Sequence, residues 1–499
     1  MIWLSRFLIS ITMLISFVAN ILAFNPETIQ EVTVNDGNSP VSELPTLAYG
    51  SQSGRIISLW GAYSSSAYLR VMDEDLNFLT EILDANDSVA MVGQSDATVL
   101  PGGGFAVAYQ GYTASAINQF RVFLRYFDSN GLPTGPSKAV TPLGDLLSES
   151  QFEPVLCSDG AGRVMVVFED RRLGDIQIMA QLFNPDGSFS GSNFVVNDGN
   201  DTCCIGYPKV DCSDAGAFVV TWHANQYVGS SSDGIDIRYR LYASNGVPIT
   251  GVLTANDSGE ELRRKEPAIA IADDESYMVV AWIEGSMDRV GVRFCNGSGV
   301  PLSSTVYVQS PDGADETAVS INPNGAAILS WEVGFGQDQR VYYQLFDAAH
   351  TPLGTPTSVI DSLRYAPNVG LGNSSAFFGY QSDATLLVGK LTDIPTDVEE
   401  SYYNSIPNAF DLKQNYPNPF NPSTTISFDL ARRQHVRLGI YNVLGQQVYE
   451  LVNGELAAGL HHVEWDGNTS RGNRATSGVY FYRIVTNDFV GSRKMILLK

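Results

Sequence analysis

Between residues 56 and 380 the chain repeats a short apolar run that ends in a large aromatic residue. The intervals between consecutive terminal aromatics are 49, 59, 54, 60, 49 and 49 residues. A period of about fifty residues with strand-like units is typical of propeller blades, because so small a unit cannot bury its own apolar face. The seven aromatics are Trp60, Tyr109, Phe168, Trp222, Trp282, Trp331 and Tyr380.

Each repeat predicts three further strands around this run. A short apolar segment precedes it, and a run of alternating apolar and polar residues follows, as at residues 235–242. Period-two alternation is typical of a strand with two different faces. A turn such as Asn245-Gly246 then predicts a hairpin to a fourth strand, which ends on an Asn-Asp signature. That signature recurs at Asn86-Asp87, Asn197-Asp198 and Asn256-Asp257.

The two ends of the repeat region predict how the ring closes. The seventh unit, from Tyr365 through Leu391, contains three strands and then runs into Pro395. Residues 31–37 resemble an isolated fourth strand with the same Asn-Asp-Gly ending. We therefore expect this N-terminal strand to pair beside residues 386–391, because closure leaves fewer exposed strand edges. The fold class is thus all-β, with a seven-bladed propeller over residues 25–393.

A string of small β-sandwiches is the alternative for this region. Such domains need about 100 residues each, twice the observed period. The recurring aromatics are accordingly interpreted as apolar wedges between blades, and the alternative is an exposed platform for stacking sugars.

The pattern changes after a polar linker at residues 394–411. Six spaced motifs follow in residues 412–499, and in this order they resemble the type A sorting domain of type IX secretion cargo. That family is similar to the immunoglobulin-like part of the flagellar hook-capping protein. The residues that match its pattern are Tyr416, Pro417, Asn418, Pro419, Phe420, Asn421, Pro422, Gly445, Trp465, Asp466, Gly467, Gly478, Tyr480, Lys494 and Lys499.

The resemblance implies a small immunoglobulin-like β-sandwich that the outer-membrane type IX machinery of a Gram-negative cell recognises. In the family the domain is often removed by a sortase, and the sequence leaves open whether that happens here. The prolines fix an extended approach to the sandwich, and Trp465 and Tyr480 are expected to fill its core.

The N-terminus carries one positive charge at Arg6, followed by an apolar run from residue 7 to residue 18. This run is shorter than the roughly 20 residues of a membrane anchor, so residues 1–23 are interpreted as a cleaved signal peptide. No later segment is long and apolar enough to span a bilayer. We expect a mature protein that is secreted or attached to the outer cell surface.

The net charge argues against one class of partner, and the cysteines allow disulfide bonds. The net charge is −24, and because the residues from Asp411 onward carry +3, the preceding part carries −27. An acidic body repels phosphate, which argues against nucleic acid. In an oxidising compartment one or two disulfides are compatible with the spacing of Cys157, Cys203, Cys204 and Cys212, and their pairing stays open. Cys295 would then be unpaired.

Chemistry-bearing motifs are few. The histidines lie in no metal or nucleophile motif, and no cofactor motif occurs. Calcium stays open at Asp198, Asn200 and Asp201, where oxygen donors alternate, although turns use the same residues for backbone hydrogen bonds. The most polar loop contains Glu169, Asp170 and Arg171, which either face a ligand or bridge two blades.

Two functions remain in competition, and we favour the first. The propeller is a non-catalytic module that binds a glycan or a protein, or it is an extracellular polysaccharide hydrolase or lyase with carboxylates at its mouth. Three or more acids with arginine and exposed aromatics at one end of the channel would favour the enzyme. A mouth of serine, glycine and threonine would favour binding.

Overall fold

All regular secondary structure in the described residues is β-strand, and no helix there is long and apolar enough to cross a membrane. The chain divides into two compact units, Met1–Thr396 and Asp397–Lys499, which we describe separately. The computed structural model describes residues 29–36, 41, 45–62, 66–87, 90–112, 120–141, 150–172, 174–198, 203–225, 235–257, 264–285, 289–311, 313–334, 339–359, 365–382, 385–392, 411–415, 418, 420, 422–430, 434–456, 459–470, 473–486 and 489–498.

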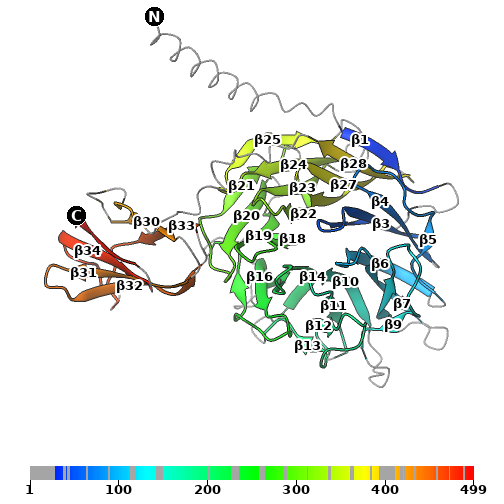
Figure 1. The fold of residues 1–499 in the computed structure, drawn as a ribbon, viewed down its shortest axis with the longest axis horizontal. Helices are drawn as coiled ribbons and strands as arrows, with labels where there is room; N and C mark the ends of the chain where they lie inside the picture. The colour runs from blue at the N-terminus through cyan, green and yellow to red at the C-terminus, as the bar shows by residue number, and fades with distance from the viewer. Residues whose placement is uncertain are drawn as a thin grey trace, which may run out of the picture. The chain divides into compact units, whose positions relative to one another are not determined.

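The first unit consists of seven four-stranded antiparallel sheets, which are the blades of a propeller (Figure 1). Blade 1 contains β2 (Thr46–Gly50), β3 (Arg55–Ala62), β4 (Ser66–Asp73) and β5 (Leu83–Asp84); blade 2 contains β6 (Ala90–Val99), β7 (Phe105–Tyr112), β8 (Arg121–Phe127) and β9 (Lys138–Ala139). Blade 3 contains β10 (Gln151–Ser158), β11 (Val164–Asp170), β12 (Gln177–Phe183) and β13 (Phe194–Val195); blade 4 contains β14 (Cys203–Cys212), β15 (Phe218–Asn225), β16 (Ile235–Tyr242) and β17 (Leu253–Thr254). Blade 5 contains β18 (Arg264–Ile271), β19 (Tyr277–Glu284), β20 (Arg289–Asn296) and β21 (Val306–Gln309); blade 6 contains β22 (Asp315–Ile321), β23 (Ala327–Val333), β24 (Arg340–Phe346) and β25 (Pro352–Ser358). Blade 7 contains β26 (Tyr365–Leu371), β27 (Ser375–Ser382), β28 (Thr385–Thr392) and the N-terminal β1 (Ile29–Thr33).

The ring closes through the N-terminal strand. Strand β1 pairs antiparallel with β28, in a register that places Ile29 opposite Leu391 and Thr33 opposite Leu387. The first strands of the blades pack against one another around a central channel, and β26 of blade 7 packs against β2 of blade 1. The predicted seven-bladed propeller with N-terminal closure is confirmed.

The recurring aromatics are core residues. All seven, from Trp60 to Tyr380, are fully buried. Trp331 of blade 6 belongs to an apolar cluster that includes Phe294 and Val292 of blade 5, so its ring fills the space between two blades. Their predicted role as wedges is confirmed, because a fully buried ring has no face free to stack on a sugar.

The Asn-Asp signature ties each fourth strand to its surroundings. Asn256 Oδ1 accepts a hydrogen bond from Ile237 N at 2.8 Å, and Asn35 accepts the equivalent bond from the backbone of β28, also at 2.8 Å. The following Asp257 accepts a bond from Thr305 of the next blade at 2.7 Å. The asparagine amide oxygen thus binds the backbone of the third strand in its own blade, and the aspartate carboxylate of blade 4 binds the neighbouring blade.

The second unit is a small sandwich of two sheets around one apolar core. One sheet has the strand order β29-β30-β33 and the other β32-β31-β34-β35. The strands are β29 (Asp411–Leu412), β30 (Thr424–Leu430), β31 (Gln434–Asn442), β32 (Gln447–Leu456), β33 (Gly459–Trp465), β34 (Gly478–Val485) and β35 (Val490–Leu497).

Several motif residues of this unit build its core. Trp465 is fully buried, and its ring lies 5.7 Å from that of Phe420 and 5.4 Å from that of Tyr480. Asn418 Oδ1 accepts a bond from Ile496 N of the last strand at 2.9 Å. Gly467 has a φ of 77°, and a Cβ there would meet the Pro422 carbonyl oxygen at 2.7 Å. Lys494 is exposed. Tyr416, Pro417, Pro419, Asn421 and Lys499 lie outside the described residues.

Candidate functional site

Within the described residues, the first strands of six blades shift register against their second strands: β6, β10, β14, β18, β22 and β26. The bulges of four consecutive blades, in β10, β14, β18 and β22, share a further feature. In each bulge one residue other than glycine adopts a left-handed backbone, at a cost of about 1–2 kcal/mol. Strain of this kind is found preferentially at functional sites. The four residues are Glu153 (φ 52°), Tyr207 (53°), Glu266 (48°) and Glu316 (39°).

These four side chains converge on one end of the central channel. A cavity of about 560 Å³ opens there and is lined by residues of all seven first strands. We call this cavity the channel mouth. Besides the four strained residues, its charged lining comprises Asp96, Lys209, Lys265 and Asp315.

Tyr207 is the exposed aromatic of the channel mouth. Its side chain is 43% exposed. One side of the ring packs against His223, at 4.9 Å between centroids. Burial, together with the charge of Lys265, lowers the pKa of His223 to about 4, so the imidazole is neutral at pH 7 and serves as an apolar support. A supported, half-exposed phenol can present its ring to a ligand.

Hydrogen bonds between neighbouring blades hold the channel mouth in shape. Lys265 Nζ lies 2.5 Å from Asp315 Oδ1, which joins blades 5 and 6. Asn368 Nδ2 donates to the Pro45 carbonyl at 2.7 Å and so joins blade 7 to blade 1. The mouth is therefore pre-formed, as small-ligand sites usually are.

The three glutamates of the channel mouth hold protons unusually tightly. Burial raises the pKa of Glu153, Glu266 and Glu316 to about 7 each. Neighbouring acids add to this effect, while the ammonium of Lys209 opposes it at all three. Carboxyls with a pKa near neutrality can exchange protons at physiological pH.

These pKa values predict how stability depends on pH. In the folded state each carboxyl binds its proton more tightly than in the unfolded chain, so the free energy of unfolding falls as the pH rises from about 4.5 to about 7. Replacing Glu316 by glutamine should flatten this dependence and stabilise the protein at pH 8 by about 1–3 kcal/mol. Urea unfolding followed by tryptophan fluorescence at several pH values measures both effects. The exposed Glu81→Gln variant is the control, and equal slopes in both variants would contradict the assignment.

The polar loop predicted from the sequence is part of a strand, and only one of its residues approaches the channel mouth. Glu169 and Asp170 are the last residues of β11 and are 8% and 2% exposed. Glu169 Oε1 accepts a bond from Tyr207 N of the next blade at 3.0 Å, which positions the strained tyrosine. Asp170 pairs with Arg172 at 2.7 Å, and Arg171 is exposed. Glu169 and Asp170 therefore make structural contacts.

The calcium hypothesis at blade 3 stays a prediction. Asn200 and Asp201 lie outside the described residues, which include Asp198. Within the described ranges no group of three or more His, Cys, Asp or Glu side chains is arranged to hold a metal ion.

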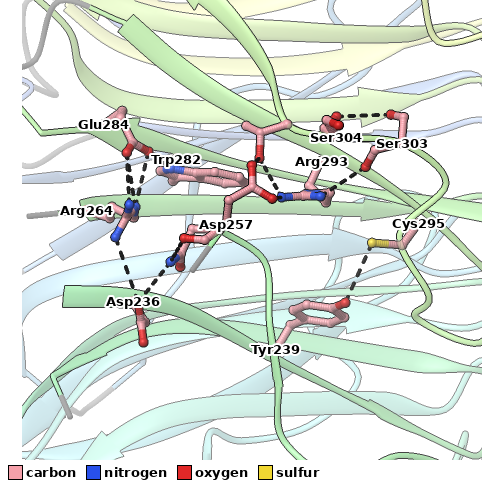
Figure 2. Close-up of polar contacts among 12 residues, drawn as sticks. Asp236, Tyr239, Asp257, Arg264, Trp282, Glu284, Arg293, Cys295, Ser303 and Ser304 are labelled. Atoms are coloured by element: carbon pink, nitrogen blue, oxygen red, sulfur yellow. Dashed lines mark hydrogen bonds and ion pairs between the residues drawn. The ribbon is translucent and has the colours of Figure 1, made fainter. Parts of the chain in front are cut away.

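A buried charge network lies next to the channel mouth in blades 4 and 5 (Figure 2). Arg264, which directly precedes Lys265, is 2% exposed and pairs with Glu284, which is 1% exposed, at 3.1 Å. Asp236 of blade 4 lies 3.8 Å from the same guanidinium. The pair anchors the start of β18, the strand that carries Glu266.

Sequence reasoning missed the strained residues, although a signal for three of them exists. Glu153, Tyr207 and Glu266 each precede a proline, which disfavours a helical backbone at the preceding residue and marks the start of a first strand. Glu316 has no following proline and gives no such signal. Acids, arginine and exposed aromatics were expected at the mouth of an enzyme. The channel mouth has several acids and an exposed aromatic, but its positively charged residues are lysines.

Comparisons with known proteins give distant likenesses to solved structures. The surface component PorZ of the type IX secretion system of Porphyromonas gingivalis is 12% identical, with a TM-score of 0.41, over 93% of this chain and 60% of that one. The chain thus spans less than two thirds of PorZ. An α-L-arabinanase of Penicillium chrysogenum is 13% identical, with a TM-score of 0.46, over 64% of this chain and 98% of that one.

An endo-arabinase of Bacteroides thetaiotaomicron is 13% identical, with a TM-score of 0.32, over 53% of this chain and 96% of that one. At such low identities and TM-scores, none of these likenesses assigns an activity to the chain. No curated protein matches it. A family model does match within the second unit: residues 418–488 are similar to the FlgD Ig-like domain.

Proposed function

We propose that the propeller binds a glycan at the channel mouth. The observation that carries this proposal is the convergence of strained side chains from four blades, Glu153, Tyr207, Glu266 and Glu316, on one pre-formed cavity. Carboxyl, ammonium and amide groups offer the hydrogen bonds that sugar hydroxyls need, and Tyr207 offers an aromatic face. The size of the cavity, about 560 Å³, lies within the range of small-ligand sites.

Binding of the full chain to a panel of soluble polysaccharides and oligosaccharides tests the proposal. Isothermal titration calorimetry should show that Tyr207→Ala and Lys209→Ala each weaken binding of the retained glycan at least about tenfold. Lys494→Ala, an exposed lysine of the second unit, is the matched control and should bind like the unchanged protein. Unchanged affinity in both mouth variants, or no retained glycan, would refute the proposal.

Glycan cleavage is the second candidate, because one specific observation favours it. Glu153, Glu266 and Glu316 share a site with pKa values of about 7, so one can carry a proton while another is ionised. A protonated carboxyl beside an ionised one is the pair that glycoside hydrolysis uses. Product release in the same panel, lost in a Glu→Gln variant that still binds, would establish cleavage. Retention without products would leave binding alone.

The proposal includes an export route. Residues 1–23 act as a signal peptide, and residues 412–499 act as a type IX sorting domain that delivers the propeller to the outer surface or the medium. The similarity of residues 418–488 to the FlgD Ig-like domain supports this role, since the sorting family resembles that domain. In a cell with a type IX system, a chain shortened before residue 412 should accumulate in the periplasm. Its normal appearance outside the cell would contradict the route.

A further inference from the structure

The first strands of neighbouring blades are joined by a repeated side-chain contact. In blade 4, Asp211 Oδ2 accepts a hydrogen bond from Ile271 N of blade 5 at 2.9 Å. In blade 6, Ser320 Oγ accepts one from Leu371 N of blade 7 at 3.0 Å. The two contacts occupy equivalent positions along the strands, so they report one fixed stagger between adjacent blades.

The pairing registers define this stagger. Asp211 and Ser320 each lie opposite the second residue of the apolar run in their own blade. Ile271 and Leu371 each lie opposite the first residue of that run. A side chain that lies opposite the second residue of the run in one blade therefore points at the position opposite the first residue of the run in the next blade. The rule applies to any pair of neighbouring blades with regular pairing at this level.

Between blades 3 and 4 these two positions are both cysteine. Cys157 lies opposite Met165, the second residue of its run, and Cys212 lies opposite Phe218, the first residue of its run. Both belong to one buried apolar cluster, and the two thiols are close enough to influence each other's pKa. Cys157 is 5% and Cys212 9% exposed, and both line a second cavity of about 300 Å³ on the channel.

We propose that Cys157 and Cys212 form a disulfide between blades 3 and 4 when the chain folds in an oxidising compartment. Both sulfurs are unbonded in this structure. The oxidant is another disulfide, either of a thiol oxidoreductase or of oxidised glutathione. A thiolate of the pair attacks that disulfide and displaces one thiol, and the second cysteine then displaces the other. The two cysteines lose two protons and two electrons, and the oxidant becomes two thiols.

The timing of this step follows from burial. Burial raises the pKa of Cys157 to about 11 and that of Cys212 well above its usual range. Because the thiolate is the attacking species, the folded dithiol reacts slowly at neutral pH. The bond therefore forms during folding, before the blades close around it, and afterwards resists reduction.

The cross-link acts on the channel mouth. Strand β10 carries Glu153, and β14 carries Tyr207 and Lys209. A covalent bond between these strands fixes the positions of the three side chains relative to one another. Cys295 has a different environment, since it is fully buried in blade 5 with Tyr239 Oη 3.6 Å from its sulfur (Figure 2).

Peptide mapping of the full chain tests the pairing. The chain is refolded with oxidised glutathione, its free thiols are blocked in denaturant, and it is digested with trypsin without reduction. Trypsin places Cys157 in residues 139–163, Cys203 and Cys204 in 173–209, Cys212 in 210–238 and Cys295 in 294–340. We expect a linked peptide of 139–163 with 210–238. Linkage of either peptide to 173–209 instead, or blocked thiols at both Cys157 and Cys212, would overturn the proposal.

Two serine variants and a control provide the second measurement. Cys157→Ser and Cys212→Ser should each leave the remaining partner available for blocking, whereas Cys295→Ser should retain the cross-link. The oxidised protein should melt a few °C above the form refolded with reductant, because the bond restricts the unfolded chain. Both serine variants should lack this difference. A melting temperature that does not depend on oxidation in the unchanged protein would argue against the bond.

Discussion

Replacing Glu284 by alanine is expected to lower the free energy of unfolding by about 3–5 kcal/mol. The Arg264 guanidinium donates to both carboxylate oxygens through Nε, at 3.2 and 3.3 Å, and the Trp282 indole donates to the same carboxylate (Figure 2). Without that carboxylate a nearly completely buried positive charge loses its closest partner. Urea unfolding followed by tryptophan fluorescence gives the loss directly.

A matched ion pair on the surface provides the control. Glu450 lies 3.1 Å from Arg437, but the two side chains are 35% and 60% exposed. Because water screens such a pair, Glu450→Ala should cost less than about 1 kcal/mol. Replacing both Arg264 and Glu284 by leucine should recover most of the loss, since no unpaired charge then remains. Equal losses in Glu284→Ala and Glu450→Ala would contradict the role assigned to the buried pair.

Replacing Val34 by aspartate should weaken ring closure and cost about 4 kcal/mol. Val34 follows β1, is fully buried, and packs in the apolar cluster that contains Trp60 and Leu386. Its backbone N donates to the Leu386 carbonyl at 2.9 Å, so the substitution introduces a charge where the first and last parts of the ring meet. Thermal unfolding and hydrogen exchange of β1 and β28 measure the effect.

The same substitution at an exposed valine separates ring closure from a general effect of aspartate. Val300 is 56% exposed at the turn after β20. Val300→Asp should change the stability by less than about 0.5 kcal/mol. If Val34→Asp is equally mild and leaves exchange in β28 unchanged, the N-terminal strand contributes little to closing the propeller.

The sequence by itself determined the ring. Seven aromatic-terminated runs at a period of about fifty residues required seven blades, because each unit needs neighbours to bury its apolar face. The missing fourth strand of the last unit and the isolated strand at residues 31–37 required N-terminal closure. Both expectations depend on the local pattern of hydrophobic and polar residues, which each segment of the chain carries by itself. The sandwich of the second unit was recognisable for a similar reason, since its motifs are local.

Only the tertiary structure decided the site. Glu153, Tyr207, Glu266 and Glu316 are about fifty to sixty residues apart along the chain, and no local motif links the three glutamates to one another or to the tyrosine. They meet because the first strands of their four blades lie around one channel, and a bulge in each of these four strands places the residue at the same cavity. The pairing of Cys157 with Cys212 follows from the stagger between two blades, which no single repeat records. Hydrophobic periodicity specifies which face of a strand is buried, whereas the group that a polar side chain meets depends on how separate blades are placed around the ring.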